Sequence, residues 1–374
     1  MNYNDCPHCD SHRNEGSSFC GNCGNPLDCP HCDDYRSQGA VFCGNCGRRL
    51  RDDVLYTPRK DRRLPPVFMI GLFAALVATF FIIVAATALY LYSVDIFRYL
   101  ADYTYYLLIL VPAPYPLVIF SGAWTQLYWV FLLVMLTASF AWLVYELYTK
   151  HIESRRKGEG LHGIEKTSIY WIGLLWPSTI FLQLAIMYLV ILGTGVEIST
   201  PELGISMYEA MFVLASAGVW EEIITRVLLI GVPLAVAASV TGKARSWRYL
   251  LGGFGVSKLS MVFIIIAAAV FGYAHNDGWG ISKVIPSFIF GMAAGFLYAK
   301  YGLHAAILLH FVNDYLMAFL WLGGSEVTLG LLTLLLIGLG IVTTIMIAMK
   351  SIPFVKNFKD RPVFPDSFAS DKDD

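Results

Sequence analysis

Long apolar stretches joined by short polar connections make up the chain from about residue 66 to residue 349. A helix needs about 20 predominantly apolar residues to cross a bilayer, and most of these stretches reach that length. The pattern predicts eight membrane-spanning helices, at residues 66–92, 124–148, 170–192, 206–230, 259–276, 284–300, 303–321 and 327–349.

Two places in this pattern are irregular. The fourth segment is expected to continue past Gly231 and Pro233 to about residue 240, with a break at these two residues. Residues 104–120 are also apolar, but Pro112, Pro114 and Pro116 interrupt them. Because proline disrupts a helix interior, we expect a loop or a re-entrant segment there.

Composition supports a membrane protein. Of the 374 residues, 56% are hydrophobic and only 15% are charged, and the mean hydropathy is +0.58, whereas soluble chains carry about 25% charged residues. The predicted fold class is an all-α polytopic membrane protein with about eight transmembrane helices, preceded by a small N-terminal module. The formal net charge of −1 argues against a nucleic-acid partner.

All the cysteines lie in the first fifty residues, in an internal repeat. The sequence Asp-Cys-Pro-His-Cys-Asp occurs at 5–10 and 28–33, and Phe-Cys-Gly-Asn-Cys-Gly occurs at 19–24 and 42–47. Two CxxC turns per repeat supply four thiolates, the ligand set of a structural Zn²⁺ ion. The predicted zinc ligands are Cys6, Cys9, Cys20 and Cys23 in the first repeat and Cys29, Cys32, Cys43 and Cys46 in the second.

This module therefore resembles a tandem zinc ribbon that holds two structural zinc ions. A disulfide framework is the alternative, but it needs an oxidising compartment, and no secretory signal precedes the cysteines. Zinc ribbons bind nucleic acid or protein. Since the basic residues of the repeats are few, a protein partner is expected; they are Arg13, Arg36, Arg48 and Arg49.

The loops between the predicted helices differ in charge. If the N-terminus is cytoplasmic, the inner loops and tail hold most of the basic residues: Lys150, Arg155, Arg156, Lys157, Lys166, Lys243, Arg245, Arg248, Lys258, Lys300, Lys350, Lys356, Lys359 and Arg361. The outer loops hold only Arg98 and Lys283. This positive-inside bias predicts a multi-pass protein of the cell membrane with both termini in the cytoplasm.

Ionisable residues inside three predicted helices are candidates for function, because they are costly in lipid. Glu222 and Arg226 are four residues apart and can form an ion pair, which leaves the adjacent Glu221 free to act. The fifth segment ends at His275. The seventh carries His310, Asn313 and Asp314, of which His310 and Asp314 share one helical face.

The three motifs together resemble the CPBP family, the CAAX-protease and bacteriocin-processing intramembrane proteases, over roughly residues 170–320. The matching residues are Glu221-Glu222-x-x-x-Arg226, Phe271-x-x-x-His275 and His310-x-x-x-Asp314. The resemblance implies an endopeptidase in which Glu221 activates water and His275 is its partner. It also implies that His310 and Asp314, with Asn313 beside them, stabilise the oxyanion or orient a membrane-protein or lipidated-peptide substrate.

Several alternatives stay open. Glu221, His275 and His310 could hold a catalytic Zn²⁺ with an open coordination position, although a metal-free glutamate mechanism is favoured. The protein could instead be a membrane scaffold or receptor that recruits partners through its ribbons. A proton-coupled transporter is a third class, but the two halves show no inverted repeat.

The predicted domains follow from these features. Residues 1–50 form the tandem zinc ribbon, 51–65 a basic linker and 66–165 the N-terminal transmembrane helices. Residues 166–322 form the protease-like core, 323–350 the last transmembrane helix and 351–374 a polar cytoplasmic tail.

Overall fold

The structure, a computed structural model, comprises two compact units, Met1–Leu64 and Pro65–Asp374, each described by itself. In the second unit it describes residues 65–110, 114–195, 205–242, 246–276 and 280–365. In the first unit it describes residues 8, 11, 12, 15, 17, 19–22, 31–40, 42–44 and 50.

The N-terminal unit contains a small cysteine-rich core. Cys20 and Cys43 are each 1% exposed, and Cys32 begins the short helix α2 (Cys32–Ser37). Cys32 and Cys43 pack with Leu50 and the ring of Tyr35. The other predicted zinc ligands, Cys6, Cys9, Cys23, Cys29 and Cys46, lie outside the described residues.

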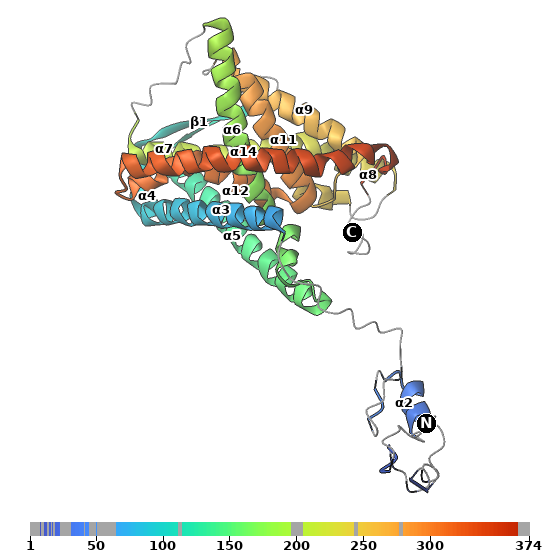
Figure 1. Cartoon of the computed structure of the whole chain (residues 1–374). Helices are drawn as coiled ribbons and strands as arrows, with labels where there is room; N and C mark the ends of the chain where they lie inside the picture. Colours follow the sequence, from blue (N-terminus) through green and yellow to red (C-terminus); the bar gives the residue numbers. More distant parts are fainter. Residues whose placement is uncertain are drawn as a thin grey trace. The chain divides into compact units, whose positions relative to one another are not determined.

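Helices dominate the described part of the second unit (Figure 1). Seven are long and apolar enough to cross a membrane. Five of these are α3 (Pro66–Leu91), α5 (Ala123–Lys157), α6 (Ser168–Thr194), α11 (Val284–Tyr301, with the one-turn η6, Ile281–Lys283, before it) and α14 (Glu326–Lys356). The sixth is Met207–Val240 and the seventh combines α12 (Leu303–Asp314), η7 (Tyr315–Met317) and α13 (Ala318–Trp321).

The fifth predicted segment, 259–276, is shorter than the other seven helices. It forms α9 (Lys258–Ala274), an apolar helix of 17 residues. The expected helical membrane fold is thus confirmed, with seven helices of spanning length and one just below it. The remaining short helices are α4 (Ser93–Tyr99), η1 (Leu100–Asp102), η2 (Gly160–Lys166), η5 (Ser246–Leu251) and η8 (Phe358–Asp360).

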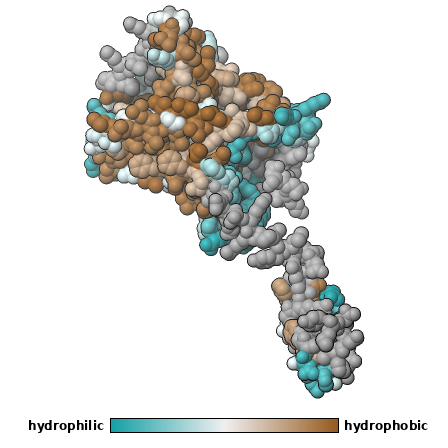
Figure 2. Space-filling view, viewed as in Figure 1, coloured by the Kyte–Doolittle hydropathy of each residue, from teal (hydrophilic) through white to brown (hydrophobic). Residues whose placement is uncertain are grey.

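Helix α6 crosses α14 and packs closely against it and α3 (Figure 1). Gly173 of α6 lies against the backbone of Ala75, and Gly340 of α14 lies against the carbonyl of Pro177. A side chain at either glycine would collide with the neighbouring backbone, so small residues set this packing, as is common between membrane helices. Apolar residues cover much of the visible face of the helical unit (Figure 2), as a lipid-facing surface requires.

The helix Met207–Val240, the fourth along the chain, changes geometry along its length. It begins as α7 (Met207–Ser216), continues as two π-helical runs, η3 (Ala217–Glu221) and η4 (Ile223–Gly231), and ends as α8 (Val232–Val240). The expected break at Gly231 and Pro233 is therefore a change from π to α geometry, and the helix continues to Val240. Pro233 lies in the first turn of α8, where proline is tolerated.

The expected loop at 104–120 is instead a β-hairpin, and the expected interruption of helix by the prolines is confirmed. Strands β1 (Thr104–Leu110) and β2 (Pro114–Ser121) form an antiparallel hairpin, with an irregularity between Leu107 and Leu108. Its tyrosines and branched aliphatic residues favour strands. Pro114 and Pro116 are compatible with β2, because β2 is an edge strand of a sheet that has two strands in the described residues.

The C-terminal segment also differs from the expected polar tail. Helix α14 extends to Lys356, and residues 361–365 fold back onto the start of α9. The carbonyls of Pro362 and Val363 accept hydrogen bonds from the backbone N–H groups of Lys258 and Leu259. The tail thus pairs donors that the first turn of a helix leaves without intrahelical partners.

Candidate active site

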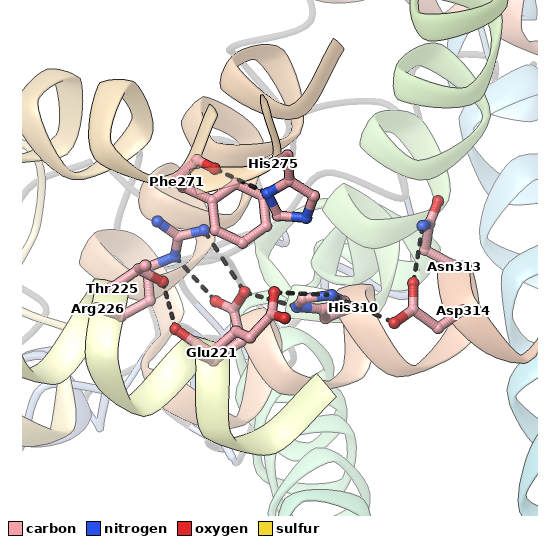
Figure 3. Close-up of polar contacts among 9 residues, drawn as sticks. Glu221, Thr225, Arg226, Phe271, His275, His310, Asn313 and Asp314 are labelled. Atoms are coloured by element: carbon pink, nitrogen blue, oxygen red, sulfur yellow. Dashed lines mark hydrogen bonds and ion pairs between the residues drawn. The ribbon is translucent and has the colours of Figure 1, made fainter. Parts of the chain in front are cut away.

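Three elements bring the ionisable residues of the membrane unit together (Figure 3). Glu221 ends η3, Glu222 follows it, and Arg226 lies in η4. His275 caps the end of α9. A run of histidine, asparagine and aspartate, at 310, 313 and 314, lies on the last two turns of α12. π-Helical geometry is frequent at functional sites, and here it flanks both glutamates.

Glu222 is the centre of a buried polar network. Arg226 Nε donates to Glu222 Oε2 at 2.8 Å, and both side chains are fully buried. His310 Nδ1 donates to Glu222 Oε1 at 2.8 Å. The predicted ion pair is therefore present, and a histidine from another helix adds to it.

Glu221 has a different environment although it is the next residue. Its side chain is 22% exposed, and its Oε2 atom is buried without a hydrogen-bond partner. The nearest ionisable side-chain atom recorded for it is His310 Nε2, at 4.0 Å from Oε2. Of the two adjacent carboxylates, Glu222 accepts hydrogen bonds at both oxygens, whereas Glu221 keeps an oxygen that can accept a proton or bind water.

Asp314 acts as an acceptor in this geometry. Its Oδ2 atom lies 3.4 Å from His310 Nε2, and its Oδ1 accepts a hydrogen bond of 3.2 Å from Asn313 Nδ2. An ionised aspartate has no proton to donate, so oxyanion stabilisation by Asp314 itself does not follow from this arrangement. Asp314 instead orients His310, whose ring also packs 5.0 Å from that of Phe290.

His275 lies on the facing segment but is not paired with Glu221. Its Nδ1 atom is 2.8 Å from the carbonyl oxygen of Phe271. Because a carbonyl can only accept, Nδ1 carries the proton, and in the neutral ring Nε2 is a free acceptor. The expected partnership with Glu221 has no direct hydrogen bond here; His310 is the histidine nearest to Glu221.

The residues expected for a catalytic zinc do not converge as ligands. In the described part of the chain, no three His, Cys, Asp or Glu side chains are grouped so that they could hold one ion. Both ring nitrogens of His310 face carboxylates, and His275 Nδ1 is bonded to a backbone carbonyl. The arrangement thus does not fit the proposed set of Glu221, His275 and His310, and no chemical step is assigned to a metal.

Sequence reasoning missed the contacts that fasten the hairpin to the helix of the glutamates. Trp220 Nε1 donates to the Leu108 carbonyl at 2.7 Å, and the Tyr105 hydroxyl is 2.8 Å from Ser216 Oγ. The Tyr103 hydroxyl donates to Glu209 Oε1 at 2.8 Å. The only signal in the sequence is the density of tyrosines before and within residues 104–106.

Two family models match the chain. Residues 204–316 match the type II CAAX prenyl endopeptidase Rce1-like family, and residues 6–50 match the double zinc ribbon family. Comparisons with curated proteins and with solved structures gave no match. The first match contains all three helical motifs of the site, and the second contains both cysteine repeats. The chain therefore carries an Rce1-like CAAX endopeptidase domain at residues 204–316, together with a double zinc ribbon at residues 6–50.

Proposed function

We propose that this protein is an intramembrane endopeptidase that hydrolyses a peptide bond with a water molecule activated by Glu221. The observation that carries the proposal is the unpaired Oε2 atom of Glu221 beside a saturated Glu222. The Rce1-like family match supports peptide-bond hydrolysis at the level of the family.

In this mechanism, Glu221 removes a proton from water as the oxygen attacks the scissile carbonyl carbon. The carbonyl becomes a tetrahedral oxyanion, which needs donors already in place. His310 Nδ1 is held by Glu222, so the proposed donor is Nε2–H, whose contact with Asp314 is long at 3.4 Å and can be given up to the oxyanion. When the C–N bond breaks, the proton taken by Glu221 passes to the leaving amine, and His275 Nε2 can relay it.

The proposed substrate is a membrane protein or lipidated peptide. The site lies among apolar helices of membrane-spanning length, and the family match is consistent with membrane-attached substrates. The charge asymmetry of the loops supports an orientation with both termini in the cytoplasm, which requires that α9 crosses the membrane together with the seven longer helices.

The double zinc ribbon is proposed to hold two structural zinc ions and to recruit a protein partner. Phe19 and Phe42 occupy the same place in the two repeats, and both rings are more than half exposed. Repeated exposed aromatic side chains are typical of protein-binding surfaces.

The proposal is tested by comparing wild type with Glu221→Gln. Both variants are expressed in the native host, and the termini of membrane proteins are compared by mass spectrometry. New termini that depend on Glu221 are expected, and purified wild-type protein should cleave peptides that span them. If both variants yield the same termini and neither cleaves the peptides, the enzyme hypothesis fails and a scaffold role replaces it.

A further inference from the structure

The hairpin runs alongside the helix that carries Glu221 and Glu222. Moving from Tyr103 to Leu108 on the strand, the helix partners move from Glu209 to Trp220. Five strand residues at ~3.3 Å and eleven helix residues at ~1.5 Å both amount to about 16 Å. The strand and the helix therefore cover the same distance side by side, and the strand comes level with Glu221 near its C-terminal end.

Strand β1 contacts both segments of the active site there. Ile109 packs with Trp220 against buried Ile224 of η4 and Ala274 of α9. Ile224 lies three residues after Glu221, and Ala274 immediately precedes His275. The end of β1 thus packs against both the segment of the general base and the segment of the histidine.

One edge of β1 pairs with β2, and the other edge contacts this helix at Leu108. Leu108 lies opposite Pro116, which has no N–H group, and the Leu108 carbonyl accepts the indole N–H of Trp220 instead. A strand residue points its N–H and C=O to the same side, and alternate residues share that side. The backbone groups of Thr104, Tyr106 and Leu108 are therefore directed to the outer edge.

This outer edge has the polar groups that an extended peptide needs. Lipid cannot satisfy backbone N–H and C=O groups, so a strand edge in an apolar environment requires a partner. A substrate helix must also unwind before its peptide bond can be hydrolysed, which releases backbone groups that need partners of their own. Two of the three side chains along this edge are large and apolar or aromatic, with Tyr106 54% and Leu108 37% exposed.

We propose that the outer edge of β1 binds an extended apolar segment of the substrate as a third strand, in the place that the Trp220 indole now occupies. This inference rests on the proposed function and specifies how its substrate is held. Strand addition supplies affinity through the main chain, so it accepts varied sequences and places a peptide bond close to Glu221.

The test uses the full-length protein and a synthetic peptide that spans a cleavage site mapped with wild type. A series of peptides, each with one amide N-methylated, probes the bound backbone without altering the enzyme. Strand pairing predicts that methylation lowers kcat/KM about tenfold or more at every second position, since each blocked hydrogen bond weakens binding.

Two variants at one residue probe the protein side. Leu108→Pro removes an N–H from the outer edge but keeps the carbonyl, and it should raise KM about tenfold with kcat nearly unchanged. Leu108→Ala removes the same side chain but keeps the N–H, so it should raise KM clearly less than Leu108→Pro does. Trp220→Phe removes the competing indole donor and should lower KM.

The outcomes separate the two proposals. Strand addition is overturned if wild type is active but kcat/KM is the same for all methylated peptides. It is also overturned if the two Leu108 variants have equal KM values. In both cases the proposed endopeptidase function stands. A flat series with a change in oligomeric state in Leu108→Pro assigns the edge to a second copy of the chain. Wild type that cleaves no mapped peptide removes the proposed function, and this inference with it.

Discussion

Arg226 Nε lies 2.8 Å from Glu222 Oε2, and neither side chain reaches the surface of the molecule. The second oxygen of the same carboxylate accepts a hydrogen bond from His310 Nδ1 at 2.8 Å. Glu222 therefore joins the helix Met207–Val240 to α12, and this connection holds His310 beside Glu221. Of the paired glutamates, one builds the site and the other is left to act in it.

Breaking this pair should destabilise the protein. Glu222→Ala leaves Arg226 as an unpaired buried charge, which costs about 3–5 kcal/mol. We expect a lower midpoint of thermal unfolding for the purified protein in detergent. The double variant Glu222→Met with Arg226→Met removes both charges and should recover much of that loss, because apolar replacement of a buried pair is often tolerated. Equal stability of wild type and Glu222→Ala would show that the pair is not structural.

Glu221 should behave in the opposite way. Glu221→Gln keeps the size of the side chain but cannot take a proton from water, so peptide cleavage should be lost while the unfolding midpoint stays near that of wild type. The two properties are measured on one preparation, by peptide cleavage and by thermal unfolding. Cleavage by purified Glu221→Gln at the wild-type rate would rule out Glu221 as the base.

Replacing the two histidines should have different effects on the stability of the protein. His310→Ala removes a hydrogen bond to buried Glu222, so both activity and the unfolding midpoint should fall, with activity down by at least ~10²-fold. Among the described residues, the His275 ring makes its hydrogen bond to the Phe271 carbonyl at the end of α9. His275→Ala should therefore lose activity with little change in stability. If His275→Ala cleaves normally, His275 takes no part in the proton relay.

Much of the fold was predictable because lipid imposes a simple pattern. All eight predicted segments became helices, since apolar length and internal backbone hydrogen bonding leave few other choices in a membrane. The spacing of Glu222 and Arg226 predicted their ion pair for the same reason, as residues four apart on a helix are neighbours.

The hairpin, the π-helical turns and the folded tail were not predictable in this way. Proline in residues 104–120 indicates an interrupted helix, but edge strands tolerate proline too, and only tertiary contacts such as Trp220 to Leu108 decide between them. The π-helical geometry around Glu221 is not marked by any particular amino-acid pattern, so the sequence does not distinguish it from an α-helix. Pairing of His310 with Glu222 rather than of His275 with Glu221 depends on how α12 and α9 meet, which periodicity does not specify.

Orientation in the membrane follows from loop charge and can be tested at exposed positions. Ser325 precedes α14 on the predicted outer side, and Arg156 lies near the end of α5 on the predicted inner side. In intact cells, Ser325→Cys should react with a membrane-impermeant maleimide, and Arg156→Cys should react only after lysis. Background from the native cysteines is measured on the unsubstituted chain. The reverse pattern would place the termini outside.

The last prediction concerns zinc. Each repeat supplies four cysteines, so the full-length protein should contain two zinc ions per chain. Cys20→Ser removes a buried ligand from the first repeat and Cys43→Ser from the second, so each variant should lose one ion. The double variant should contain none, because the described residues of the active site offer no converging ligand set. If that variant still cleaves peptide, catalysis needs no zinc. If the double variant instead retains one zinc ion, and that ion is lost when His275→Ala is added, a metal lies at the active site.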